Sequence, residues 1–197
     1  MNLNCNLTFE TFLDSAGSKH LESLGFDSHS LPPTMKSCEV LFLNRIVRGV
    51  GIRNTQGGME FFSRDVSLRH FYTVGSLGVV SLPQKADSKT EICCLFADMF
   101  DYLAYLTLLR EKRGASFPRH CDCYVMNDVR NFIPMMLDVV NYGRIHCFFP
   151  NNDWGQVMTA TFTMKNSRSR SEARRYLDYV SLYDFLMAKE LVQCLMM

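Results

Sequence analysis

The second half of the chain alternates between short apolar runs and longer segments with helical periodicity. The apolar runs predict buried strands at 92–97, 121–126 and 144–149. Helical patterns follow these runs at 99–113, 131–141 and 154–165. A short strand is expected over 176–180, and Ser181 begins a further predicted helix over 181–197. Strands that alternate with helices in this way favour parallel pairing with covering helices.

The first half of the chain has a different rhythm. Residues 8–26 predict two short helices with a break near Gly17, and residues 39–66 read as strands. Within the second segment, NTQGG at 54–58 separates two strand-like runs and predicts a hairpin turn.

These patterns predict an α/β protein with a mostly parallel central sheet flanked by helices, preceded by N-terminal helices and an antiparallel hairpin. We expect an N-terminal helical segment, a hairpin elaboration and an α/β domain, at 1–44, 45–88 and 89–197.

Polar residues collect where the predicted parallel strands end. In sheets of this kind, ligands bind beyond the carboxyl ends of the strands. The side chains expected there are Asp98, Asp101, Asn127, Asp128, Asn151, Asn152, Asp153 and the single tryptophan, Trp154. Carboxylates at such an edge could hold Mg²⁺. The alternative is that Asp and Asn cap helices and form turns there.

The cysteine and histidine residues do not favour a zinc site. HCDC at 120–123 and ICC at 92–94 lie in strand patterns, and no CxxC pair is present. We therefore expect these cysteines, and His146 beside Cys147, to be buried core residues.

Composition and charge narrow the picture only slightly. The chain has 197 residues, of which 47% are hydrophobic, and 21 Lys and Arg oppose 20 Asp and Glu, giving a net charge of +1. Any nucleic-acid affinity must therefore come from a local cluster. The tract at 165–175 supplies one: Lys165, Arg168, Arg170, Arg174 and Arg175. It predicts either a phosphate-contacting loop or a solvated, mobile connection.

The sequence shows neither a signal-peptide pattern nor a membrane-spanning segment. The start, MNLNCNLTFETF, has no basic region followed by an apolar stretch, and no run approaches 18 apolar residues. We therefore expect a cytoplasmic protein that makes no membrane contact, with its eight cysteines reduced.

Several short runs, taken in order, resemble a known family. LFADMFDYLAY (95–105), MND (126–128), FFPNNDWGQVMT (148–159) and VSLYDFL (180–186) are similar to runs of Toprim domains, especially in primase-like proteins of Bacteroides-type mobile elements. GIRNTQGGMEFFSRD (51–65) resembles the hairpin that precedes the domain in those proteins. The resemblance covers roughly residues 45–190.

The resemblance implies a Toprim-like fold whose metal site is degenerate. The family binds Mg²⁺ with a Glu after the first strand and a DxD after the third, and these positions fall on Ala97, Pro150 and Asn152. The late Lys-Asp pair of the family falls on Val180 and Ser181. The scaffold positions are kept at Asp101, Asn127, Gly155, Gln156 and Asp184.

The resemblance therefore implies a protein without catalytic residues or cofactor that binds DNA or a DNA-processing protein through the crevice or the basic tract. One alternative is a divergent Mg²⁺-dependent primase or nucleotidyl transferase that uses the shifted acids Asp98, Asp101 and Asp153. The other is a protein–protein interaction module with Trp154 as a contact. Phe148 and Phe149 would then be contacts too, although core packing is the expected role of both.

Overall fold

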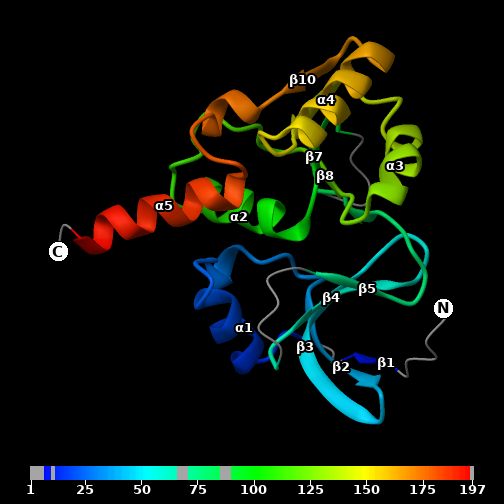
Figure 1. Ribbon diagram of the computed structural model, residues 1–197, viewed down its shortest axis with the longest axis vertical. Helices are drawn as coiled ribbons and strands as arrows, with labels where there is room; N and C mark the ends of the chain where they lie inside the picture. The colour runs from blue at the N-terminus through cyan, green and yellow to red at the C-terminus, as the bar shows by residue number, and fades with distance from the viewer. Residues whose placement is uncertain (1–6, 10–11, 66–70, 85–89, 196–197) are drawn as a thin grey trace.

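The protein, described by a computed structural model, has two lobes (Figure 1). The structure describes residues 7–9, 12–65, 71–84 and 90–195. The predicted domain boundary between 88 and 89 lies outside these described residues. So do the first six positions and residues 10–11, 66 and 196–197 of the predicted elements.

The N-terminal lobe is an antiparallel sheet with strand order β1-β2-β3-β4-β5. Its strands are β1 (Leu7–Phe9), β2 (Lys36–Phe42), β3 (Arg45–Arg53), β4 (Met59–Ser63) and β5 (Tyr72–Val74). The predicted turn at 54–58 joins β3 to β4, and the Asn54 side chain stabilises it by accepting from the N–H groups of Gln56 and Gly58. Helix α1 (Ser15–Glu22) and the short 3₁₀ helix η1 (Ser28–Ser30) complete the lobe.

The C-terminal lobe is a mixed sheet with strand order β10-β9-β7-β8-β6. Its strands are β6 (Val80–Leu82), β7 (Ile92–Phe96), β8 (Asp122–Val125), β9 (Arg144–Phe148) and β10 (Ser169–Ser171). Four strands run parallel, and β6 pairs antiparallel with β8 at one edge. The prediction of a mostly parallel sheet is confirmed.

Helices cover both faces of this second sheet. They are α2 (Met99–Arg110), α3 (Phe132–Asp138), α4 (Asp153–Lys165) and α5 (Leu182–Leu195), with the 3₁₀ helices η2 (Val129–Asn131) and η3 (Ala173–Tyr176). Successive strand residues point to opposite faces: Cys94 and Phe96 pack with α2 and α5, while Cys93 and Leu95 pack with α3 and α4. None of the helices in the described part of the chain is long and apolar enough to cross a membrane.

One cluster of buried apolar side chains contains residues of both lobes. Leu21, Val50 and Phe62 of the N-terminal lobe belong to the same buried cluster as Phe96 and Phe100 of the C-terminal lobe. Helix α2 lies between the two sheets and buries side chains toward both (Figure 1). The position of one lobe on the other is therefore fixed by a continuous apolar core.

Three local predictions are wrong. One helix, α1, forms in place of two, and Gly17 lies inside it. A Cβ there would come within 2.9 Å of Val50 of β3, so the close packing of α1 on β3 favours glycine at this position. Residues 7–9 form β1, which pairs with β2. Residues 176–180, predicted as a short strand, form the end of η3 and a turn. The edge strand of the second sheet beside β9 is β10, inside the basic tract at 165–175.

Six cysteines are free and buried, as expected: Cys38, Cys93, Cys94, Cys121, Cys123 and Cys147. Phe148 and Phe149 are also fully buried, which confirms the expected core role of both side chains.

Candidate functional site

The strands β7, β8 and β9 end at one edge of the second sheet, as parallel pairing requires. The polar residues predicted for this edge do lie at these strand ends. Most of these side chains form hydrogen bonds with backbone groups of the turns and helix ends.

The turn after β7 is closed by two acids. Asp98 is the N-cap of α2, and its Oδ1 accepts from the backbone N–H of Asp101 at 2.9 Å. Asp101 lies in the first turn of α2 and is 1% exposed. Its Oδ1 accepts from the backbone N–H of Tyr183 at 3.0 Å, so it caps the start of α5 from a position 82 residues away.

The two acids share an environment that disfavours charge. Burial raises the pKa of Asp101 well above its usual range, and the charge of Asp98 raises it further. Asp98 exposes surface in the crevice, yet the protein packed around its carboxylate still raises its pKa, as does the charge of Asp184. Among the described residues, neither acid forms a salt bridge.

The turn after β8 is likewise held by its own side chains. Asn127 has a left-handed backbone with φ of 54°, and its Oδ1 accepts from the N–H of Met99 at 2.9 Å. Asp128 caps η2 and forms two bonds with the Arg130 guanidinium, which hold the pKa of its carboxyl below its usual range.

The turn after β9 uses its two amides in opposite ways. Asn152 is the N-cap of α4, and its Oδ1 accepts from the N–H of Gly155 at 2.9 Å. Asn151 points to the chain before α5, where its Nδ2 donates to three backbone carbonyls, those of Ala173, Tyr176 and Tyr179, at 2.9–3.3 Å.

The other residues of this turn have simpler roles. A Cβ on Gly155 would lie 2.0 Å from the carbonyl oxygen of Pro150, so the turn requires glycine there. Asp153 and Trp154 are exposed on the first turn of α4, and Trp154 is 39% exposed.

These residues do not fit a Mg²⁺ ion of the Toprim type. Ala97 and Pro150 have no side-chain oxygen, and the Oδ1 of Asn152 is occupied by the cap. Within the described ranges, no group of three or more His, Cys, Asp or Glu side chains is placed to hold a metal ion. The trio of Asp98, Asp101 and Asp153 therefore has no geometric support.

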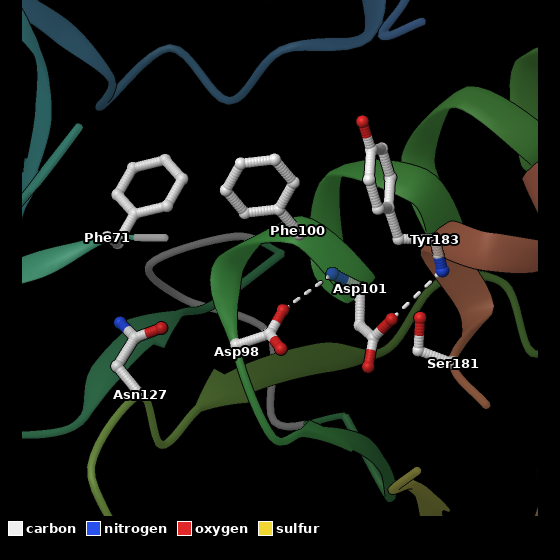
Figure 2. A pocket seen from close by; sticks show the side chains of 7 residues that line it. All are labelled: Phe71, Asp98, Phe100, Asp101, Asn127, Ser181 and Tyr183. Carbon is white, nitrogen blue, oxygen red and sulfur yellow. Dashed lines mark hydrogen bonds between the residues drawn. The ribbon is translucent and has the colours of Figure 1, made fainter. Parts of the chain in front are cut away.

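A pocket of about 320 Å³ opens between the lobes, and we call it the interlobe pocket. Figure 2 shows its rings in one row and its polar ends in a second row. The lining residues are Phe71, Phe100, Tyr183, Asn127, Asp98, Asp101 and Ser181. Three sequence-predicted residues meet here, namely Asp98, Asp101 and Asn127, whereas Asp128, Asp153 and Trp154 are not among the lining residues.

Sequence reasoning missed the aromatic wall of this pocket. Phe71 comes from the N-terminal lobe, and Tyr183 comes from α5, so no local pattern joins them to Asp98.

The start of α5 at Ser181, which brings Tyr183 to the pocket, does have a local sequence signal. The Ser181 hydroxyl accepts from the N–H of Asp184 while Asp184 Oδ2 accepts from the N–H of Ser181, each at 3.1 Å, which is a capping box of the S-x-x-D kind.

The basic tract is partly structural, which corrects its prediction as a loop. It contains β10 and η3, and Glu172 between them is 3% exposed. Arg170 and Arg175 both pair with this carboxylate. Lys165, Arg168 and Arg174 are exposed, and no side-chain partner is recorded for them within the described part of the chain.

Exposed apolar side chains also occur on two neighbouring segments of the C-terminal lobe. Val129 of η2, Ile133 and Leu137 of α3, and Val140 in the turn after α3 are each 57–69% exposed. On α4, Val157 is 65% exposed and Met164 86% exposed. We call these six residues the α3–α4 outer face.

Comparisons with solved structures find partial structural similarity to several chains, two of which are described here. The primase fragment of the bacteriophage T7 primase-helicase protein has a TM-score of 0.46 and 9% identity, covering 83% of this chain and 64% of that chain. A chain from the complex of bacteriophage T7 lagging-strand DNA polymerase with primase domains, bound to an RNA/DNA hybrid and dTTP, has a TM-score of 0.44 and 10% identity, covering 83% and 79%. No family model and no curated protein matches the chain.

Proposed function

We propose that this protein is a non-catalytic, Toprim-like accessory factor of DNA processing in mobile elements, which binds nucleic acid through phosphate contacts. One observation carries the first half of the proposal. The three positions where the resemblance expects metal-binding acids are Ala97, Pro150 and Asn152, and the last is occupied as a helix cap. Phosphoryl transfer of this kind needs ions that clamp the attacking and leaving oxygens.

Primer synthesis and strand cleavage test the absence of catalysis. The protein is assayed with Mg²⁺ and with Mn²⁺ on single-stranded and nicked templates, and we expect no turnover above a blank. Turnover that disappears in an Asp153→Ala or Asp98→Ala variant would contradict the proposal, because it would restore the shifted acids as a working site.

The basic tract supports phosphate binding with fewer cations than its sequence offers. Arg170 and Arg175 both form salt bridges with Glu172, and Lys165, Arg168 and Arg174 are the exposed cations that remain for an outside anion. Three phosphate contacts on duplex DNA predict a slope of log K against log salt near −2.7, which is a loss of about fortyfold in affinity over a fourfold rise in salt.

A salt series on a random duplex tests this surface. Replacing Lys165, Arg168 and Arg174 by Ala should bring the slope close to zero, whereas Arg130→Ala, which removes an exposed Arg already paired with Asp128, should leave it unchanged. Equal slopes for the parent and the triple variant would rule out the tract as the contact surface.

A protein partner is the second candidate, and the α3–α4 outer face is the observation that favours it. Apolar side chains gathered on one surface are typical of interaction sites. If the parent binds no nucleic acid even at low salt, this candidate replaces the first.

A further inference from the structure

The interlobe pocket is lined by two carboxyl groups, those of Asp98 and Asp101. No Lys, Arg or His side chain lines it among the described residues. Burial is costly for a carboxylate unless an opposite charge or hydrogen bonds compensate it. Each of these two acids has one oxygen bonded to a backbone N–H, of Asp101 in one case and of Tyr183 in the other. The pocket therefore favours a positively charged ligand.

The other wall is aromatic. Phe71 and Phe100 are 9% and 6% exposed, and their rings contact each other edge to face at 5.7 Å between centroids. Phe100 makes a similar contact with Tyr183 at 5.0 Å. Aromatic rings attract a cation through their negative faces and also provide an apolar surface for an alkyl stem.

The combination selects an organic cation over a metal ion. A divalent ion requires several oxygen ligands around it, and no suitable group of side chains is present in the described ranges. A guanidinium or alkylammonium group needs only one or two carboxylates on one side and tolerates rings on the other. The volume of about 320 Å³ accommodates a group the size of an arginine side chain.

We propose that the interlobe pocket binds a guanidinium or alkylammonium group, with Asp98 and Asp101 as the anionic partners and Phe71, Phe100 and Tyr183 as the apolar wall. The cation belongs either to a free small amine or to a basic side chain of a protein partner. This site is separate from the basic tract, so it holds whether or not the protein binds nucleic acid.

Calorimetric titration and thermal shift with agmatine test the proposal, with n-butanol as a neutral probe and MgCl₂ as a metal probe. We expect agmatine to bind and raise the melting temperature, while the other two do not. Asp98→Asn and Asp101→Asn keep the acceptor oxygen that each backbone N–H uses, so both variants should fold. Each should weaken agmatine binding by about tenfold or more.

Asp153→Asn is the matched control, because it removes an exposed acid outside the pocket and should leave agmatine affinity unchanged. N-acetyl-arginine methylamide distinguishes the two sources. Binding as tight as that of agmatine assigns the pocket to a partner's side chain, and rejection of it assigns the pocket to a free amine. The proposal is overturned if agmatine does not bind, or if both pocket variants bind it as the parent does.

Discussion

At the scale of single residues, the turn after β9 shows how neighbouring identical side chains acquire different roles. The Asn152 side chain is an acceptor, whereas the amide nitrogen of Asn151 is a donor to three carbonyls. An aspartate can replace an acceptor but cannot donate when ionised. The same substitution should therefore have little effect at Asn152 and destabilise the protein at Asn151.

We expect Asn152→Asp to leave the free energy of unfolding unchanged within about 0.5 kcal/mol, because Asp and Asn are equally good N-caps. Asn151→Asp should destabilise by about 2–4 kcal/mol, since it removes three hydrogen bonds and places a carboxylate against carbonyl oxygens. Urea unfolding of both variants measures this. Similar losses for the two would show that the Asn151 bonds contribute little.

Asp101 is the second residue whose role can be separated by substitution. Its folded pKa is raised above the unfolded value, so its contribution to stability is present below about pH 3.8 and is lost as pH rises through the folded pKa. Asp101→Asn keeps the acceptor for the N–H of Tyr183 and removes the charge, so its stability relative to the parent should increase with pH.

Asp101→Ala provides the comparison. It leaves the N–H of Tyr183 without its acceptor and should be less stable than Asp101→Asn by about 1–3 kcal/mol. Thermal unfolding of the three proteins from pH 3 to pH 8 measures both effects. A parent and an Asn variant with parallel pH profiles would contradict the buried-charge account.

At the scale of elements, β10 pairs with β9 in parallel, and one buried carboxylate links the end of β10 to β9. Glu172 Oε1 lies 2.7 Å from His146 Nδ1 and 2.8 Å from Arg170 Nε, and its other oxygen pairs with Arg175. Burial alone would raise the pKa of Glu172, but the hydrogen bonds from His146 and Arg175 and the charges of both arginines hold it at about 2. The basic tract is thus folded around an acid.

Glu172→Gln should lower the free energy of unfolding at neutral pH by on the order of 2–3 kcal/mol, because it removes the negative charge that pairs with Arg170 and Arg175. For the parent, this contribution is present above about pH 4.5 and is lost as pH falls toward 2. The parent and the variant should therefore converge in acid. Denaturant unfolding between pH 2 and 7 measures this, and a constant difference across that range would be the contrary result.

At the scale of the whole molecule, the two lobes share one core and several polar links. The Tyr183 hydroxyl donates to the carbonyl of Leu24, and the N–H of Asp27 donates to the Thr107 hydroxyl. Arg110 of α2 pairs with the Asp27 carboxylate. The sheets are separate and each lobe keeps a smaller apolar cluster of its own, but the cluster around α2 contains residues of both lobes.

We therefore expect the protein to unfold in a single cooperative transition. Trp154 is the only tryptophan and lies on α4, so its fluorescence reports on the C-terminal lobe, while far-ultraviolet circular dichroism reports on both lobes. The two urea midpoints should coincide. Phe100→Ala removes a ring from the shared core and should lower the free energy of unfolding by about 3–5 kcal/mol, so that both midpoints move together to lower urea. Separate midpoints would show independent lobes.

The sequence by itself determined the elements that depend on local pattern. Apolar periodicity predicts strands at 92–97 and 144–149 and helices at 99–113 and 154–165, and the structure has them at 92–96, 144–148, 99–110 and 153–165. Ser181 marks the start of α5. That Ala97 and Pro150 carry no side-chain oxygen is also a property of the sequence alone. So is the presence of polar residues at the strand ends.

Only the tertiary structure decided what those polar residues bind. Asp101 and Asn151 find their partners 82 and 22–28 residues away, and Glu172 is buried because β10 brings it beside His146. The interlobe pocket needs Phe71 from one lobe and Asp98 from the other. Periodicity reports which residues are buried along one element, whereas a site between elements depends on how they dock, and that is set by the shared core of the whole chain.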